Sequence, residues 1–463
     1  MTSADFPTRL AELVLNDSSH NPSLYANLRS IRRSALSIPH RLHSILSDAH
    51  FAKEVSGHCG LPLVANERCG SWYIDPADKV GSAYFKSTDG HHSMWDFSLR
   101  RLNLQLFSIL AKYGGAVIVD STRRGKNLPD AFSKTVPIWV AVINRALYPE
   151  ALSMHAVQVP PPPNELGESE VSQIDARLDK FTSAFCSLQL DLEKLRTELK
   201  RPIQLNWAIN GYFDVDSEDL LPSVGNHLLV LCSASRRVRG AEISEGGYIQ
   251  GAGDDSEGWS HGLTAQIFWK HREKLMAAPE DDLPDLIQQL SEEEKPGTNV
   301  TGEGVKIPPT TNLHIGIGQL SQLGSFDLII NCGGNSGGDL PGIRNLQCRD
   351  HKLGSKDLRE RLPALVDTTK NQLQKIRESQ ILVTCATGKD LSVGVAVALL
   401  CLFYDDEGQL KDDLGIGSTV EVNKQLVKQR LAWISSAKPD ANPSRATLQA
   451  VNSFLMQRPD YIA

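Results

Sequence analysis

The chain has 463 residues, of which 41% are hydrophobic and 22% charged, and its formal net charge is −7. This length predicts about two or three globular domains. The negative charge argues against unspecific coating of nucleic acid, although local basic clusters occur. The start of the sequence lacks a secretory signal pattern, and the apolar run 393–403 is too short to span a bilayer. Because the 8 cysteines have no framework spacing and no signal pattern is visible, we expect reduced thiols in a cytosolic or nuclear protein. We favour the cytoplasm as its location and expect no membrane partner.

The first part of the chain, residues 1–277, is predicted to form a mixed α+β domain in which short strands and Gly-rich turns alternate with helices. Its first segment, 1–58, reads as helical and basic. The clustered arginines of this segment are Arg29, Arg32 and Arg33. Such a cluster suits contacts with the phosphates of an RNA backbone.

Two further elements of this domain have clear patterns. An apolar run predicts a buried strand over 115–119 that ends at Asp120. Apolar residues at alternating spacings of about three and four predict one long helix over about 170–200, closed by Arg201-Pro202. We expect this helix to pack on its own domain, with a coiled-coil dimer as the alternative.

The second part of the chain begins after a break. Residues 278–309 are rich in Asp, Glu, Pro, Gly and Thr, which predicts a linker with a short helix in it. From 310 to 463 strand patterns alternate with helix patterns, which is typical of a parallel α/β domain.

One loop of this second domain has the layout of a phosphate-binding loop. Residues 381–400 read ILVTCATGKDLSVGVAVALL: a buried strand, a cysteine, a short Gly-containing turn and an apolar helix. Backbone N–H groups and a helix N-terminus favour an anion there. The residues predicted to line this site are Cys385, Thr387, Gly388, Lys389, Asp390 and Ser392. The order of residues resembles the tyrosine-phosphatase loop Cys-x-x-Gly-x-x-Arg-Ser/Thr.

The loop departs from the phosphatase pattern in a residue that matters for catalysis. Leu391 stands where the phosphatase arginine would hold two oxygens of the phosphoryl group, and Thr384 replaces the usual histidine. Losing such a donor costs on the order of a hundredfold in rate. We therefore favour a phosphate or pyrophosphate site without phosphatase activity over a structural loop or a residual phosphatase. Asp390 would repel an anion unless it pairs with a cation such as Arg445 or points away.

A second candidate site follows the predicted strand at 115–119, in the stretch AVIVDSTRRGK. Hydroxyls and backbone N–H groups at a strand end, with cations after them, suit a phosphate-bearing ligand. The residues concerned are Asp120, Ser121, Thr122, Arg123 and Lys126. Asp120 could face a hydroxyl or a metal ion, and a charged surface turn is the alternative reading.

Three other stretches of the N-terminal domain carry clustered polar residues. YFKSTDGHH contributes Lys86, Ser87, Thr88, Asp89 and His91, although a generic turn reads the same way. YIQGAGDDSEGW places Asp254 and Asp255 in a Gly-rich loop, where close carboxylates suit Mg²⁺ and a solvated acidic loop is the alternative. SASRRVRG offers Arg236 and Arg237 to RNA phosphates or to a small ligand.

Together these stretches carry a family resemblance. NERCGSWY, YFKSTDGH with WDFSLRRLN, VDSTRRGKNLPDAFSKTVPIW, SASR, YIQGAGDD, CATGKDLSVGVA and NPSRATLQAVNSFL resemble the initiator tRNA phosphoribosyltransferases of fungi and plants. The resemblance covers residues from about 60 to 460. It implies a C-terminal domain similar to dual-specificity phosphatases, whereas the N-terminal part resembles no common phosphoribosyltransferase fold.

The resemblance also implies a reaction. The donor would be phosphoribosyl pyrophosphate with Mg²⁺, and the acceptor a ribose 2′-hydroxyl in the T-stem of cytoplasmic initiator methionine tRNA. Asp120 or Asp89 would face the sugar, and Lys389, Arg123 and Lys126 would bind phosphates. No obligate protein partner is expected. The competing hypotheses are a dual-specificity-type phosphatase and a non-catalytic RNA-binding protein with a degenerate phosphatase module.

Overall fold

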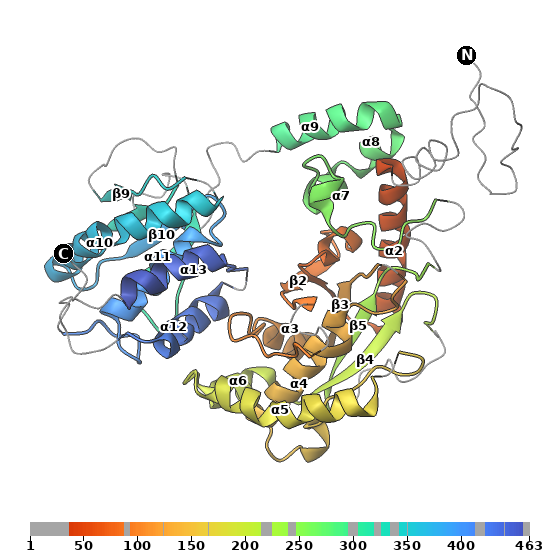
Figure 1. Ribbon diagram of the computed structural model, residues 1–463, viewed down its shortest axis with the longest axis horizontal. Coiled ribbons are helices and arrows are strands. Elements are labelled where there is room, and N and C mark those ends of the chain that lie inside the picture. Colours follow the sequence, from red (N-terminus) through yellow and green to blue (C-terminus); the bar gives the residue numbers. More distant parts are fainter. Residues whose placement is uncertain are drawn as a thin grey trace, which may run out of the picture. The chain divides into compact units, whose positions relative to one another are not determined.

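The structure is a computed structural model (Figure 1). It describes residues 37–87, 93–123, 125–164, 166–213, 225–238, 247–294, 304–318, 326–333, 342–349, 351–412, 422–438 and 440–456. The chain divides into two compact units. Unit 1 comprises Met1–Phe97, Leu106–Thr182 and Leu192–Lys295. Unit 2 comprises Ser98–Gln105, Ser183–Asp191 and Pro296–Ala463, so two short segments from the first half of the sequence belong to the C-terminal unit.

Unit 1 is built on a five-stranded sheet of order β2-β1-β3-β5-β4. The strands are β1 Leu63–Asn66, β2 Lys79–Ala83, β3 Gly115–Asp120, β4 Ile203–Ile209 and β5 His227–Ser233. All neighbouring strands within this sheet pair in parallel. The unit is therefore α/β, and the α+β arrangement predicted for it is wrong. Strands β1, β3 and β5 are buried along their whole length, which is typical of parallel sheets covered on both faces.

The helices of unit 1 account for most of its remaining described residues (Figure 1). The α-helices are α2 Ile38–Cys59, α3 Leu106–Tyr113, α4 Val136–Leu147, α5 Glu168–Cys186, α6 Leu192–Leu199, α7 Ala265–Lys270, α8 Arg272–Ala277 and α9 Leu283–Glu293. Short helical turns are η2 Gly70–Tyr73, η4 Ala131–Thr135, η5 Leu152–Met154, η7 Ser256–Gly258 and η8 Glu280–Asp282.

The long helix predicted over 170–200 is in fact two helices, α5 and α6, because the chain leaves the helical conformation between them. Gln189 has a φ of 53°, which ends a right-handed helix. Gln189 belongs to the segment Ser183–Asp191 of unit 2, and its side-chain oxygen accepts a hydrogen bond of 2.9 Å from Gln429 Nε2 of the same unit. The apolar spacing continues through this break, since Leu188 is fully buried, and periodicity alone therefore did not reveal it.

The segment predicted as a linker, 278–309, starts as part of unit 1. Leu283, Ile287 and Leu290 on α9 are buried in the same apolar cluster as Leu42 and Ile45 on α2. Burial of three such side chains stabilises α9 against the unit by several kcal/mol, at roughly 1.5–3 kcal/mol each. The acidic and Pro-rich composition of the segment concealed this apolar stripe.

Unit 2 contains a sheet of order β6-β7-β10-β8-β9. Its strands are β6 Val305–Lys306, β7 Leu313–Ile317, β8 Leu328–Asn331, β9 Ile343–Asn345 and β10 Ile381–Cys385, and its helices are α10 His351–Lys375, α11 Leu391–Phe403, α12 Lys424–Ala437 and α13 Arg445–Leu455. Only the short edge strand β6 is antiparallel to its neighbour. The α/β prediction for this part of the chain is confirmed, with the strand that ends at Cys385 between β7 and β8.

Within the described residues, no helix is both long and apolar enough to cross a membrane.

Candidate active site

The candidate site of unit 1 lies at the carboxyl ends of its central strands. Asn66 closes β1, Asp120 closes β3 and Ser233 closes β5. In a parallel sheet these ends share one edge, which is where α/β proteins bind their ligands. The loop after Tyr248 brings Asp254 to Asp120 through a common partner.

That common partner is Arg68, which sequence analysis did not single out. Its Nη2 lies 2.8 Å from Asp120 Oδ1 and its Nη1 lies 2.8 Å from Asp254 Oδ2. The carboxylate side chains are 0% and 2% exposed, and the arginine side chain is 29% exposed. Burial alone would lower the pKa of the guanidinium, but the carboxylates of Asp120 and Asp254 outweigh this effect and raise it. One fixed positive charge therefore holds two buried carboxylates from distant parts of the sequence.

The carboxylate of Asp120 is occupied by protein donors. Arg68 Nε and Asn66 Nδ2 donate to Oδ2 at 3.2 and 2.8 Å. Cys69 Sγ and the Ser121 N–H donate to Oδ1 at 2.9 and 2.8 Å, beside Arg68 Nη2. Burial raises the pKa of the Cys69 thiol, which suits its role as a neutral donor. Because a carboxylate has only about four lone-pair directions, Asp120 anchors Arg68 and does not present an open face to a sugar.

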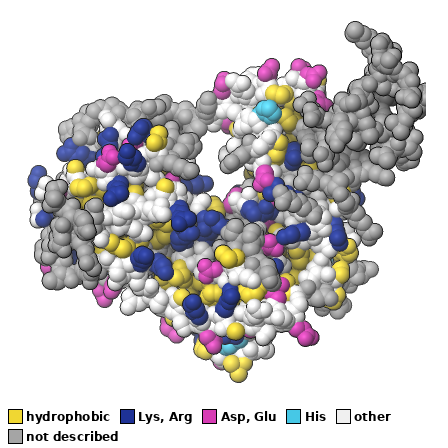
Figure 2. Space-filling model, viewed as in Figure 1, with side chains coloured by type: hydrophobic (Ala, Val, Ile, Leu, Met, Phe, Trp, Pro, Cys, Tyr) yellow, Lys and Arg dark blue, Asp and Glu magenta, His cyan; other side chains and the backbone are white. Residues whose placement is uncertain are grey.

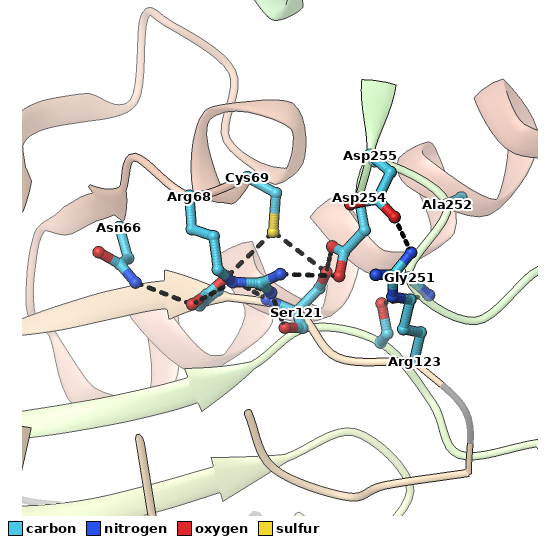
Figure 3. A network of polar contacts seen from close by, with 12 residues as sticks. Asn66, Arg68, Cys69, Ser121, Arg123, Gly251, Ala252, Asp254 and Asp255 are labelled. Atoms are coloured by element: carbon cyan, nitrogen blue, oxygen red, sulfur yellow. Dashed lines mark hydrogen bonds and ion pairs between the residues drawn. The ribbon is translucent and has the colours of Figure 1, made fainter. Parts of the chain in front are cut away.

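The two neighbouring aspartates predicted to bind Mg²⁺ turn to different partners (Figure 3). Asp254 accepts a hydrogen bond of 2.5 Å from Ser121 Oγ in addition to its ion pair with Arg68. Asp255 forms an ion pair with Arg123. No group of three or more His, Cys, Asp or Glu side chains that could hold a metal ion occurs among the residues that the structure describes. These two carboxylates do not fit a protein-bound Mg²⁺, because each already has a cationic partner.

Side-chain hydrogen bonds of Gln250 hold the turn that follows Asp120, and sequence analysis did not single out this residue. Gln250 Oε1 accepts hydrogen bonds of 3.1 Å from the N–H groups of Gly125 and Val238, and its Nε2 donates to the Lys126 carbonyl at 2.7 Å. Gly251 is next to it with a φ of 66°, and a Cβ there would lie 2.9 Å from the Thr122 carbonyl oxygen. The loop that carries Asp254 is thus packed directly against the turn that follows β3.

A buried acid supports this loop from the side of α2. Ser235 Oγ donates to Asp48 Oδ2 at 2.8 Å and accepts from the Gly251 N–H at 3.1 Å. Tyr248 OH donates to Asp48 Oδ1 at 2.7 Å. Burial raises the pKa of Asp48 well above its ordinary value, although both hydroxyls act to lower it. No local pattern marks Asp48, since its role depends on residues almost 200 positions away.

The remaining predicted residues of unit 1 lie around this edge. The Lys86 carbonyl accepts a hydrogen bond of 2.9 Å from Thr135 Oγ1, which places the stretch after β2 beside η4. Lys126 Nζ lies 3.2 Å from Asp130. Arg236 and Arg237 follow β5 and are exposed, with the Arg236 guanidinium 4.9 Å from the Tyr248 ring centroid. Residues Thr88, Asp89, His91, Arg29, Arg32 and Arg33 lie outside the described residues.

The Cys385 loop of unit 2 keeps the features that stabilise an anionic sulfur. Cys385 Sγ lies 3.1 Å from Ser392 Oγ and 3.9 Å from Thr387 Oγ1. Burial alone would raise the pKa of the Cys385 thiol, but the Ser392 hydroxyl and the N–H groups of Ser392 and Asp390 lower it below its ordinary value of 9.0. Gly388 has a φ of 65°, and a Cβ there would lie 2.9 Å from Ile317 Cγ1, so the turn requires glycine.

The acidic residue in this loop points away from the predicted anion site. Asp390 Oδ1 accepts hydrogen bonds from the Ser444 N–H at 2.8 Å and from Thr447 Oγ1 at 2.6 Å. It therefore binds the first turn of α13, where a negative charge is favourable. Lys389 is about half exposed, and its Nζ lies 3.5 Å from Asp440 Oδ2. The lysine is left as the cation of the loop, while Leu391 begins α11.

Fold and sites define a two-unit α/β protein whose C-terminal unit carries a phosphatase-like loop without its arginine. Comparison with models of known protein families identifies the family to which the chain belongs. The description "Rit1 N-terminal domain" matches residues 31–292, and "Rit1 DUSP-like domain" matches residues 342–455. The chain belongs to the Rit1 family, and the family resemblance inferred from the sequence is confirmed.

Two curated relatives cover nearly the whole chain. A tRNA A64-2′-O-ribosylphosphate transferase of Saccharomyces cerevisiae is 34% identical in an alignment of 493 residues, which covers 92% of this chain and 94% of the relative. An uncharacterized protein of Schizosaccharomyces pombe is 33% identical over 435 residues, 90% of this chain and 93% of that protein. No solved structure matches the chain.

Proposed function

We propose that this protein transfers a 5-phosphoribosyl group from phosphoribosyl pyrophosphate to a ribose 2′-hydroxyl in the T-stem of cytoplasmic initiator methionine tRNA. Pyrophosphate is released, and the modified tRNA is excluded from elongation. The observation that carries this proposal is the similarity to a tRNA ribosylphosphate transferase across 92% of the chain, which includes both units.

The reaction places its main demand on the leaving group. The bond between C1 of the donor ribose and a pyrophosphate oxygen breaks, the 2′-oxygen bonds to C1, and the hydroxyl proton is released. Pyrophosphate leaves with the bonding electrons, so cations fixed near it stabilise the transition state. In unit 1 these cations are Arg68, Arg123 and Lys126. Asp120 and Asp254 act by holding Arg68 in place, and we assign them a positioning role.

We further propose that Mg²⁺ enters with the pyrophosphate of the donor. Magnesium commonly binds through substrate phosphates and retains several waters. The alternative, binding to Asp254 and Asp255, would require both carboxylates to leave Arg68 and Arg123.

The tRNA is proposed to bind through its backbone and shape, in the cytoplasm. Arg236 and Arg237 are exposed at the carboxyl edge of the unit 1 sheet. In the view of Figure 2, Lys and Arg side chains are also spread over the visible face of the part that contains α10 to α13. Local basic surfaces of this kind bind phosphates even when the net charge of the chain is negative.

Intact-mass measurement of tRNA tests the proposed function. Purified initiator tRNA incubated with the protein, Mg²⁺ and phosphoribosyl pyrophosphate is expected to gain the mass of one phosphoribosyl unit. Elongator methionine tRNA under the same conditions is the control and should stay unmodified. If initiator tRNA binds but gains no mass, the protein is a binding protein and the transferase proposal is wrong.

The Cys385 thiol separates the transferase from a phosphatase. Cys385→Ser is expected to leave the transfer rate within about threefold of wild type, because an anion loop acts through backbone N–H groups and not through a nucleophile. Cys186→Ser, at an exposed cysteine, is the matched control. Transfer is measured by the same mass assay, and folding by circular dichroism.

Two outcomes would contradict this assignment. One is loss of transfer in a folded Cys385→Ser protein. The other is turnover of an aryl phosphate by the wild type that disappears in the variant, since this would make Cys385 a working nucleophile despite Leu391.

A further inference from the structure

The sheets of the two units have the same spatial strand order. The order of the strands along the chain also becomes the same when one connection between strands is changed. Unit 2 has the order β6-β7-β10-β8-β9, and unit 1, read from its other edge, has the order β4-β5-β3-β1-β2. In unit 2 the pair β6 and β7 comes first along the chain, whereas in unit 1 the pair β4 and β5 comes last among the strands. Moving β6 and β7 behind α13 makes the two chain orders match strand for strand.

The helices follow the same correspondence. Helix α10 joins β9 to β10 as α3 joins β2 to β3, and α11 follows β10 as α4 follows β3. Helix α10 packs on α13 and so does α11, while α3 and α4 both pack on α6. The one difference among the described strands is the direction of the edge strand, since β6 is antiparallel to β7 and β4 is parallel to β5.

The correspondence pairs Asp120 with Cys385. Each is the last residue of the strand that lies third in its sheet, next to β5 in unit 1 and next to β7 in unit 2. The sequences that follow are DSTRRGK and CATGKD, which share a threonine two positions on and a Gly-Lys pair. The two glycines, Gly125 and Gly388, have φ values of 70° and 65°.

The helices that follow the two loops also share a pattern. Both contain a Val-Ala-Val run, at 140–142 in α4 and at 395–397 in α11. Both runs are buried, with exposed fractions of 0–1%. The connection is longer in unit 1, where η4 precedes α4 at Val136, than in unit 2, where α11 begins at Leu391. The two units thus share a strand end, a glycine with a positive φ and a helix pattern in addition to the topology.

We propose that the two units are circularly permuted copies of one phosphate-binding fold, and that the loop after Asp120 binds a phosphate group as the counterpart of the loop after Cys385. That this phosphate belongs to the donor rests on the proposed function. The chain then has two anion sites, one in each unit. In unit 1 the position of the phosphatase thiolate is taken by a carboxylate.

The contacts of Asp120 explain how an anion could bind above a carboxylate. A free carboxylate at the base of the loop would repel a phosphate. Arg68, which it shares with Asp254, donates to Asp120 together with Asn66 and the Cys69 thiol, and these donors reduce the negative potential of its carboxylate. Arg123 belongs to the loop itself and adds a cation that the shorter loop of unit 2 lacks; in this structure it pairs with the exposed Asp255, which a bound phosphate would displace.

Tungstate, a phosphate-sized dianion, tests the proposal by calorimetric titration of the full chain. The wild type is expected to bind at two sites. Gly125→Val and Gly388→Val are each expected to remove one site, because a β-branched residue strongly disfavours a positive φ. The site that remains in each variant reports that the chain is still folded. Gly114→Val is the matched control, since Gly114 has a φ of 78° at the opposite end of β3 with nothing near its Cβ, and it should keep both sites.

A single tungstate site in the wild type, or two sites in Gly125→Val, would overturn the proposal. A crystal structure with tungstate should place one ion over Ser121, Thr122 and Gly125 and the other over residues 386–391. The mass assay on initiator tRNA is independent of this result. If the wild type binds tungstate at two sites but does not modify tRNA, the proposed function is wrong and the proposal of two permuted phosphate-binding units is supported. If it modifies tRNA but binds tungstate at one site, the proposed function is supported and the proposal of two permuted units is wrong.

Discussion

Replacing Arg68 with methionine is expected to destabilise unit 1 by about 3–5 kcal/mol, the usual effect of removing one partner from a buried ion pair. Asp120 and Asp254 would then be two buried carboxylates without a counter-charge. Transfer should fall by about 10²–10³-fold, as when one fixed donor is taken from a developing negative charge. Denaturant unfolding of the full chain and the tRNA mass assay measure the two effects.

The control for this variant is Arg145→Met. Arg145 is 22% exposed, similar to Arg68, but its partner Asp179 is 93% exposed. A pair of that kind contributes about 0–1 kcal/mol. Arg68→Lys should recover part of the stability, because it restores the charge but not the forked geometry. Unfolding of Arg68→Met within 1 kcal/mol of wild type would mean that the two carboxylates do not depend on Arg68.

Asp120→Asn is expected to reduce transfer by about 100-fold, the effect of a misplaced group in a site whose geometry is fixed. The amide fills the same volume but no longer binds the guanidinium as an anion, so Asp254 is the carboxylate that remains paired with Arg68, beside the Ser121 carbonyl. Because Asp120 acts through Arg68, kcat should fall while the KM for tRNA stays the same. Steady-state kinetics with initiator tRNA measure this split.

Asp179→Asn is the control for that variant, since it removes a surface carboxylate of the same unit. A rise in the KM for tRNA with kcat unchanged would argue that Asp120 supports tRNA binding. A rate within threefold of wild type would remove Asp120 from the site altogether.

The sequence was sufficient for the α/β class of the C-terminal part of unit 2, but not for the segments Ser98–Gln105 and Ser183–Asp191 that belong to the same unit. The apolar run before Cys385, the glycine that turns the chain and the apolar helix after it are all local signals, and they specify a strand, a loop and a helix. The orientation of Asp390 was left open, because it depends on Ser444 and Thr447 more than fifty residues later.

Unit 1 was harder to predict because its sheet is assembled from distant segments. Strand β3 pairs with β5, and the pairing begins with Gly115 opposite Leu228. No local pattern in the sequence predicts such a pairing. The short strands β1 and β2 and their turns were therefore read as part of an α+β domain. Parallel pairing became evident only from the register of all five strands.

The sequence predicted residues of the candidate site in separate stretches, without indicating that these stretches lie together. Asp120, Ser121 and Arg123 were recognised in one stretch, and Asp254 and Asp255 in another. The contact between Ser121 and Asp254 spans 133 positions, so only the fold brings the stretches together. Arg68 was overlooked because a single arginine in ERCGSWY has no spacing that marks it, and its importance comes from burial between two acids.

The segment Ser98–Gln105, which belongs to unit 2, has a consequence for synthesis of the protein. The Arg100 carbonyl accepts a hydrogen bond from Ser435 Oγ, a residue made 335 positions later. At roughly 5–20 residues per second, the ribosome needs about 17–67 s to supply that partner. For this interval the segment is present in the nascent chain without the helix it binds. Unit 2 can therefore be completed only after its last helices have been synthesised, although its segment Ser98–Gln105 is synthesised much earlier.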